Sequence, residues 1–282
     1  RQIWKRVTWD AASLGTLGAQ GTDTRKLKGK MIDLPSLTTP DAISLHSNLH
    51  VLASAGITHL ALEASSHGLE QYRLDGLNIH VAAFTNLTRD HLDHHHDMDT
   101  YFAAKARLFT DILMHAGVAV INIDDPYGRK LAEMIAADTA TPRVLVTLGF
   151  AKDADFRIIK IEPVAGLLQM LVSHCDDDWH IPLALSGTFQ AMNALTAAIM
   201  GHMSGLPLQD SLHAIAFLKA ATGRMQTVSG HPYGAQIVVD YAHTPDALAA
   251  ALAALRPEVT GRLVVLFGCG GDRDPGKRPM MG

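Results

Sequence analysis

The sequence reads LEASSHGL at residues 62–69 and FTNLTRDHLD at residues 84–93, two stretches in which a short apolar run becomes polar. Open parallel sheets bind their ligands at the carboxyl ends of their strands, where such polar residues fall. We therefore expect chemistry at Glu63 and His91, close to a helix that carries Lys105. A carboxylate, an imidazole and a lysine in this arrangement suit a divalent metal ion and phosphate.

Glu63 and His91 could both be metal ligands. A carboxylate can bind Mg²⁺ directly, and a neutral imidazole can add one nitrogen to a site otherwise built from oxygen atoms. Taken singly, a Glu or a His at the end of a strand is more often a solvated or capping residue. The metal hypothesis therefore depends on the surrounding pattern.

Lys105 lies in YFAAKARLF, residues 101–109, a strong helix-forming run with apolar residues that face inward. On its own, such a lysine would extend its ammonium group from a partly buried helix to water. A desolvated lysine instead has a lowered pKa and becomes nucleophilic enough to react with CO₂. Carbamylation would turn this cation into an anion that can bind a metal ion.

Alternating strand and helix patterns predict an α/β fold with a mostly parallel sheet flanked by helices. A hairpin with strands at 156–162 and 167–172 adds antiparallel strands to this sheet. We expect one domain over residues 1–222, a hinge at residues 222–223, and a truncated Rossmann-like domain over residues 223–282. The predicted strands are 58–63, 80–86, 118–123, 144–148, 235–239 and 263–267, and the predicted helices are 42–55, 101–115, 127–137, 191–202, 208–218 and 245–255.

Two Thr-Pro-Asp triplets, at residues 39–41 and 244–246, predict helix starts with Thr as the N-cap and Pro in the first turn. The amides at a helix N-terminus also attract anions.

The chain resembles the Mur ligase family through several motifs that occur in the family's order. One such motif is a weak signal, but several in register make coincidence improbable. The motifs are LEASSHGL (62–69), NLTRDHLD (86–93), AAK (103–105), GRM (223–225), VDYAHTPDAL (239–248) and FGCGGDRD (267–274).

The resemblance implies a binding site for ATP and Mg²⁺. The residues matching Glu63 and His91 hold Mg²⁺ in the family, and the lysine matching Lys105 is carbamylated and supports a second Mg²⁺. These three residues are also the expected catalytic residues. The positions that match the family's nucleotide contacts are Gln190, Asn193, Arg224 and Asp240.

The resemblance also implies a UDP-muramoyl-peptide substrate, bound by the residues matching Thr38, Thr39, Ser65, Gln71 and Arg73. A guanidinium at position 73 suits a carboxylate or a diphosphate, because it can donate paired hydrogen bonds. Without the resemblance, Arg73 would be interpreted as a surface ion pair and Gln71 as an ordinary surface amide.

Three positions depart from the family pattern. Asp-Tyr-His-Gly becomes DHHH at residues 93–96, which we interpret as a solvated loop with an incidental metal site as the alternative. Gln190 replaces the usual Asn and keeps its amide on a longer arm. Gln226 replaces the usual Glu and removes a negative charge.

The sequence contains no Gly-x-x-x-x-Gly-Lys-[Ser/Thr], and residues 268–271 lack the Lys-Ser/Thr pair of a phosphate loop. The family carries that loop upstream of the segment matching Arg1, and its Asp-Asn-Pro-Arg segment follows the part that ends at Gly282. We therefore expect an internal fragment that cannot complete a catalytic cycle alone.

The implied reaction is ATP-dependent addition of meso-diaminopimelate or L-lysine to UDP-N-acetylmuramoyl-L-alanyl-D-glutamate through an acyl phosphate, in peptidoglycan synthesis. Three alternatives stay open: a folylpolyglutamate synthase-like ligase, a metal-dependent hydrolase that uses a carbamylated lysine, and a module that only binds substrate or metal.

Composition is typical of a cytoplasmic protein that binds neither nucleic acid nor membrane, and we expect a monomer. The net charge is -4, which disfavours nucleic-acid binding by bulk electrostatics. Cys175 and Cys269 are too few for a disulfide framework and are expected to stay reduced. No apolar run reaches membrane-spanning length, and no secretory signal is visible.

Overall fold

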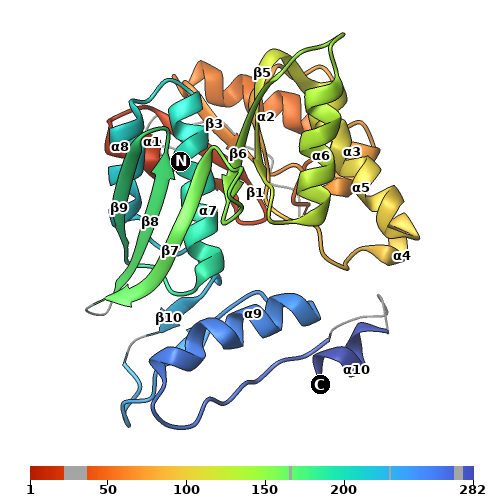
Figure 1. The fold of residues 1–282 in the computed structure, drawn as a ribbon. Coiled ribbons are helices and arrows are strands. Elements are labelled where there is room, and N and C mark those ends of the chain that lie inside the picture. Colours follow the sequence, from red (N-terminus) through yellow and green to blue (C-terminus); the bar gives the residue numbers. More distant parts are fainter. Residues whose placement is uncertain (22–36, 165–166, 229, 270–275) are drawn as a thin grey trace.

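The computed structural model describes residues 1–21, 37–164, 167–228, 230–269 and 276–282. Its larger part is a layered α/β body, and the C-terminal segment lies along one end of that body (Figure 1). Among the described residues, no helix has the length and apolar character needed to cross a membrane. The α/β fold class is confirmed.

The first sheet is small and has the strand order β2-β1-β3. Strand β1 (Ala11–Gly15) pairs antiparallel with β2 (Gly18–Gln20) and parallel with β3 (His59–Leu62). Helices α2 (Ala42–Ser54) and α3 (Ser66–Glu70) flank it. Their apolar residues form one buried cluster with this sheet, so Glu63 leaves β3 at the edge of a packed layer.

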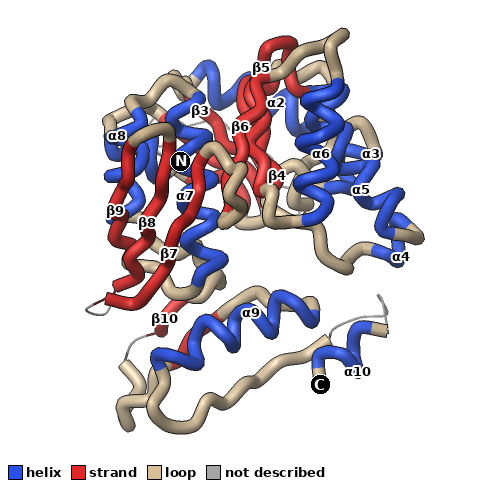
Figure 2. Tube along the Cα trace, viewed as in Figure 1, coloured by secondary structure: helices blue, strands red, loops and turns tan. Residues whose placement is uncertain are grey.

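The second sheet has six strands that follow one another in sequence order (Figure 2). Its first four strands run parallel, and the last two pairings are antiparallel. The first of these antiparallel pairings confirms the predicted hairpin. The strands are β4 (Ile79–Phe84), β5 (Leu113–Asn122), β6 (Val144–Gly149), β7 (Phe156–Val164), β8 (Leu167–His174) and β9 (Asp177–Leu183).

Helices cover both faces of this sheet. Val120 contributes to one buried cluster and its neighbours Ala119 and Ile121 to another, because successive residues of a strand point to opposite faces. A strand that is apolar on both faces is typical of a covered parallel sheet. The covering helices are α1 (Gln2–Arg6), α7 (Thr188–Met203), α8 (Leu208–Ala214) and a 3₁₀ turn (Ile215–Phe217) on one face, and α5 (Met98–Arg107), a π-helical turn (Leu108–Ile112) and α6 (Pro126–Ala137) on the other.

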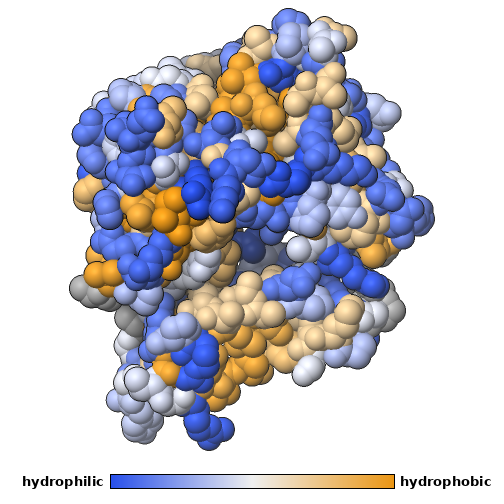
Figure 3. Space-filling view, viewed as in Figure 1, coloured by the Kyte–Doolittle hydropathy of each residue, from blue (hydrophilic) through white to orange (hydrophobic). Residues whose placement is uncertain are grey.

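The C-terminal segment contains a two-stranded antiparallel sheet, β10 (Gln226–Val228) and β11 (Ile237–Val239). Helix α9 (Pro245–Leu255) follows, then a 3₁₀ turn (Arg256–Glu258) and α10 (Lys277–Met281). Figure 3 shows apolar surface over this segment as well as over parts of the body.

Four expectations about the fold were wrong. The predicted helix 101–115 ends at Arg107, and the chain enters β5 at Leu113 after a π-helical turn. The run 263–267 is not a strand, because it lies exposed and without a ladder partner among the described residues. The other two concern the strands next to the site and a helix cap.

Strands β3 and β4, both expected in one mostly parallel sheet, belong to different sheets. Among the described residues β3 pairs with β1, and β4 pairs with β5. The carboxyl ends that carry Glu63 and His91 therefore do not adjoin through a hydrogen-bonded ladder.

The cap of α2 is Asp41, whose carboxylate accepts a hydrogen bond from the Ser44 amide at 3.0 Å, and not Thr39 as predicted. Thr39 uses its hydroxyl elsewhere. At the second triplet the prediction was confirmed: Thr244 is the N-cap of α9, and its hydroxyl accepts from the Ala247 amide.

Candidate functional site

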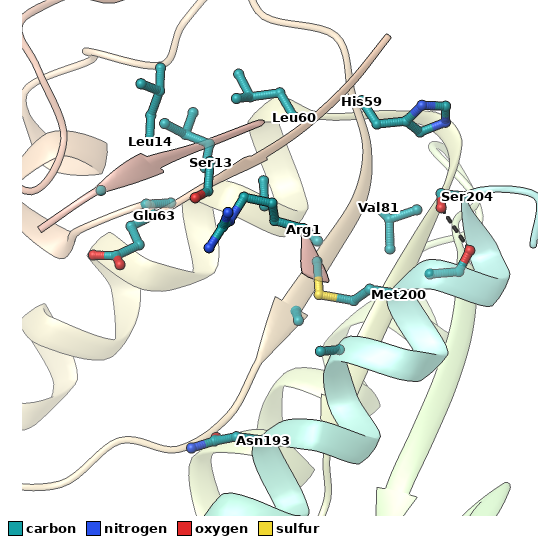
Figure 4. A pocket seen from close by; sticks show the side chains of 18 of the residues that line it. Arg1, Ser13, Leu14, His59, Leu60, Glu63, Val81, Asn193, Met200 and Ser204 are labelled. Atoms are coloured by element: carbon teal, nitrogen blue, oxygen red, sulfur yellow. Dashed lines mark hydrogen bonds between the residues drawn. The ribbon is translucent and has the colours of Figure 1, made fainter. Parts of the chain in front are cut away.

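A cavity of about 1320 Å³ lies between the two sheets of the body. Residues along the whole of β3 and β4 line it, and α7 contributes a third wall. In Figure 4, Glu63 and Asn193 enter this region from different elements, the end of β3 and helix α7. Six of the predicted site residues line this cavity: Thr38, Glu63, Ser65, Lys105, Gln190 and Asn193.

Glu63 is held in place by the turn after β1. Its Oε2 accepts hydrogen bonds from the Thr16 amide at 3.0 Å and from the Thr16 hydroxyl at 2.7 Å. Gly15, which precedes Thr16, has no room for a side chain, since a Cβ there would lie 2.3 Å from the Glu63 Cδ. No local signal pointed to Gly15 and Thr16, because they meet Glu63 only through the pairing of β1 with β3.

Lys105 reaches the cavity from α5. Its Nζ lies 5.8 Å from the ring centroids of both Phe84 and Tyr101. Burial lowers the pKa of Lys105, and the charge of Asp125 opposes this in part. Although the residue as a whole keeps some exposed surface, its ammonium group is desolvated. A larger fraction of neutral amine is the condition that reaction with CO₂ requires.

His91 does not line the cavity. Its ring contacts the Tyr101 ring edge-on, with 5.9 Å between the ring centroids. Tyr101 therefore contacts both Lys105 and His91. The structure brings Glu63 and Lys105 to one cavity, and it places His91 one aromatic ring away from Lys105.

Asp90 connects His91 to the C-terminal segment. His243 Nε2 lies 3.2 Å from Asp90 Oδ2, and His91 Nε2 lies 3.7 Å from the same oxygen. Burial acts to raise the pKa of Asp90, but the hydrogen bond with His243, the charge of His91 and the His91 amide together lower it to about 2. The hydrogen bond with Asp90 raises the pKa of His243.

The predicted substrate residues form a second group around the start of α3. The Thr39 hydroxyl donates to the Glu63 carbonyl at 2.8 Å and accepts from the Ser65 amide at 2.9 Å, so it is buried and fully used. Ser65 caps α3 by accepting from the Gly68 amide at 3.2 Å.

Arg73 extends this group. One guanidinium nitrogen donates to the Thr39 carbonyl at 2.7 Å, and Nε donates to Gln71 Oε1 at 3.1 Å. Thr38 completes it through a hydroxyl contact of 3.0 Å with Thr16. These contacts link the predicted substrate residues to Glu63.

The predicted nucleotide residues come from two parts of the chain. Asp240 accepts hydrogen bonds from the Met225 and Ala242 amides, both at 2.8 Å, and the Arg224 guanidinium lies 4.5 Å from the Tyr241 ring centroid. Gln190 and Asn193 lie on α7, at the cavity. Residues 270–274 of the FGCGGDRD motif lie outside the described residues.

The start of α7 approaches α9 closely. Gly187 has φ 92°, and a Cβ there would lie 2.7 Å from the Ala254 Cβ. This close packing brings the C-terminal segment next to the helix that carries Gln190 and Asn193.

The donors at the cavity suit a hard divalent cation. Glu63 supplies a fixed carboxylate, and carbamylated Lys105 would supply two more oxygen atoms. Mg²⁺ prefers oxygen ligands of this kind.

The fold and cavity define a mixed α/β body that is followed by a smaller C-terminal segment. The model of the Mur ligase middle domain matches residues 2–201, and that of the Mur ligase glutamate ligase domain matches residues 223–282. The chain belongs to the Mur ligase family.

Curated relatives and a solved structure agree with this assignment. UDP-N-acetylmuramoyl-L-alanyl-D-glutamate--2,6-diaminopimelate ligases from Chelativorans sp. (strain BNC1) and Brucella melitensis biotype 1 are each 44% identical to the whole chain, which covers 56% of either protein. A solved ligase of the same name is 34% identical, with a TM-score of 0.74 over 99% of this chain and 55% of that one.

A more distant likeness shows the fold alone. Folylpolyglutamate synthetase from Lactobacillus casei is 18% identical, with a TM-score of 0.54 over 77% of this chain and 52% of that chain. The chain spans about half the length of the curated relatives that it matches, at 56%.

Proposed function

We propose that this chain is part of an ATP- and Mg²⁺-dependent ligase that adds meso-diaminopimelate to UDP-N-acetylmuramoyl-L-alanyl-D-glutamate in peptidoglycan synthesis. The observation that carries the proposal is 44% identity over the whole chain to ligases of that name. The cavity supports it, because Glu63 and Lys105 enter the same space as Gln190 and Asn193. Diaminopimelate is preferred to L-lysine on the names of these relatives.

The reaction would form an amide in two steps. A carboxylate oxygen of the peptide substrate attacks the γ-phosphorus of ATP, and ADP leaves. The amine of the incoming amino acid then attacks the acyl carbon, phosphate leaves, and the nitrogen gives up a proton. Activation is needed because a free carboxylate is a poor acyl donor.

Glu63 and His91 would hold Mg²⁺, which would offset negative charge on the transferred phosphoryl group. Lys105 would act as its carbamate and would support a second Mg²⁺. To form the carbamate, neutral Nζ attacks the carbon of CO₂, and the proton that it loses passes to water. The desolvated surroundings of Lys105 support this role, since they favour the neutral amine.

The other residues would bind the two substrates. Gln190, Asn193, Arg224 and Asp240 would contact the nucleotide, and the close approach of α7 and α9 supports a site shared by the two parts of the chain. Thr38, Ser65, Gln71 and Arg73 would bind the UDP-muramoyl-peptide. Thr39 would act by positioning Ser65, because its hydroxyl is buried and already used.

The same proposal includes two domains, over residues 1–222 and 223–282, and a monomeric state. It also includes a cytoplasmic location, because the reaction uses ATP. Binding to nucleic acid or membrane is not part of it.

The test is Lys105→Ala in the enzyme encoded by the intact gene, with formation of the UDP-muramoyl-tripeptide as the readout. We expect ligation to fall by about 10²–10³-fold, as when a group that stabilises transition-state charge is lost. Short carboxylic acids or bicarbonate should restore part of it. Lys130→Ala is the matched control, since Lys130 is an exposed helix lysine whose Nζ lies 3.6 Å from Asp99.

Two outcomes would count against the proposal. Unchanged turnover of Lys105→Ala would contradict the proposed role of the carbamate. Glutamate addition to a folate by the wild-type enzyme would favour the folylpolyglutamate alternative. Supplying diaminopimelate and L-lysine in parallel decides which amino acid is added.

A further inference from the structure

A group of histidines lies beside the candidate site and has no part in the proposed reaction. Helix α4 (Leu92–His95) carries His94 and His95 toward Glu70 at the end of α3. We call Glu70, His94 and His95 the histidine cluster. The sequence predicted a solvated loop here, which was wrong for His95, because that residue is 0% exposed.

The ligand atoms of the histidine cluster are gathered closely enough for one metal ion. One ring nitrogen from each histidine and one carboxylate oxygen all lie within 4.8 Å of one another. His94 Nε2 is 2.5 Å and His95 Nδ1 is 3.6 Å from Glu70 Oε2. Ligand atoms on a tetrahedral ion with bonds of about 2.0–2.2 Å lie roughly 3.3–3.6 Å apart, so small side-chain shifts suffice.

His95 is held in the orientation that a ligand needs. Its Nε2 lies 2.9 Å from the hydroxyl of buried Ser66, and its ring stacks on Tyr101 at 5.0 Å with planes 10° apart. When Nε2 donates its proton to Ser66 Oγ, Nδ1 keeps its lone pair on the side of Glu70. Metal-binding histidines are commonly oriented by such an outer hydrogen bond.

Glu70 and His94, the other two members of the histidine cluster, are accessible from solvent. Glu70 is 42% exposed and His94 is 32% exposed, so an ion can enter and keep a water ligand. His67 stacks on the His94 ring at 4.0 Å and supports its position.

We propose that Glu70, His94 and His95 bind one Zn²⁺, with water as the fourth ligand. Two imidazoles and one carboxylate suit Zn²⁺ and disfavour Mg²⁺, which prefers oxygen atoms alone. The ion would join α3 to α4, and so tether the segment after β3 to the loop that carries His91. The chemistry differs from that of the Glu63 and Lys105 cavity, so the two sites would take different metals.

The experiment is a titration of the chelator-treated full chain with Co²⁺, followed by its visible d–d absorption, and then displacement by Zn²⁺. We expect one Co²⁺ per chain with bands that Zn²⁺ removes. His94→Ala and Glu70→Gln should each weaken binding by at least about 10-fold, and Ser66→Ala by a similar factor, as loss of outer hydrogen bonds does elsewhere. His96→Ala is the matched control, because His96 is exposed and outside the cluster.

Thermal unfolding with and without Zn²⁺ gives a second readout that does not depend on ligase activity. Zn²⁺ should raise the Tm of the wild type and of His96→Ala, and should leave His94→Ala unchanged, since an ion stabilises only the state that binds it. Equal Co²⁺ spectra and Tm shifts in the wild type, His94→Ala and Glu70→Gln would overturn the proposal. The contact between Glu70 and His94 would then be an ion pair only.

Discussion

The body, residues 1–222, and the C-terminal segment, residues 223–282, bury similar apolar runs to very different extents. In the body, Val120 and Ile121 of β5 are both 0% exposed although they face opposite sides of the sheet. In the C-terminal segment, Ile237 and Val239 of β11 are 41% and 45% exposed, and Leu266 is 100% exposed.

The difference lies in the partners available, not in the residues. Strand β5 has a parallel neighbour on each side and helices over both faces. Strand β11 pairs only with β10 among the described residues, and a two-stranded sheet is marginal by itself. An apolar run therefore becomes a buried strand only where other elements supply both its hydrogen bonds and its cover.

The largest effect on stability should come from a large-to-small substitution in the core of the body. Phe156 is 0% exposed in the cluster between the sheet and α7. Phe156→Ala should lower the free energy of unfolding by about 3–5 kcal/mol, because it removes buried surface and leaves a cavity. Urea unfolding followed by tryptophan fluorescence measures this, since Trp4, Trp9 and Trp179 pack against the same cluster.

Phe217→Ala is the matched control for that change. Phe217 is 57% exposed, and the Arg6 guanidinium covers its ring at 3.9 Å. The control should cost about 1 kcal/mol or less, in the range of an exposed cation–π contact. Equal losses for the two phenylalanines would break the comparison, because the body would then be no better packed than an exposed surface.

An intermediate effect should come from the cap of α6. Asp125 accepts hydrogen bonds from the Tyr127 and Gly128 amides, and also from the Leu87 amide after β4. Asp125→Ala should cost about 1–2 kcal/mol, as for other lost N-caps. The same unfolding assay measures it, with Asp176→Ala on the exposed β8–β9 turn as the control. A loss no larger than that of Asp176→Ala would mean that the cap does not hold α6 to the sheet.

Local signals predicted much of the fold. Thr244 and Pro245 marked the start of α9, and the apolar period of residues 191–202 marked most of α7. The strand ends that carry Glu63 and the helix that carries Lys105 were also found, because polar residues that follow an apolar run are visible in one sequence.

What depends on contacts between distant segments could not be predicted. Thr39 matched a cap pattern, yet its hydroxyl is taken by Glu63 and Ser65, so Asp41 caps the helix. His95 lay in a polar run and was expected in solvent, but the stacking of Tyr101 and the hydroxyl of Ser66 bury it. Neither partner is visible from the local pattern.

The smallest effect should come from Leu266, which lies in the run 263–267 that was predicted as a strand. With its side chain 100% exposed, Leu266→Ala removes no buried contact and should change the free energy of unfolding by less than about 0.5 kcal/mol. Urea unfolding followed by circular dichroism measures this, with Leu148→Ala in the body as the contrast, because Leu148 is 0% exposed and should cost about 2–5 kcal/mol. A loss above about 1 kcal/mol for Leu266→Ala would contradict the comparison, since only a side chain that is buried in solution can cost that much. Residues 263–267 would then pack as the predicted strand, and the two regions would differ in the number of their strands but not in how they bury them.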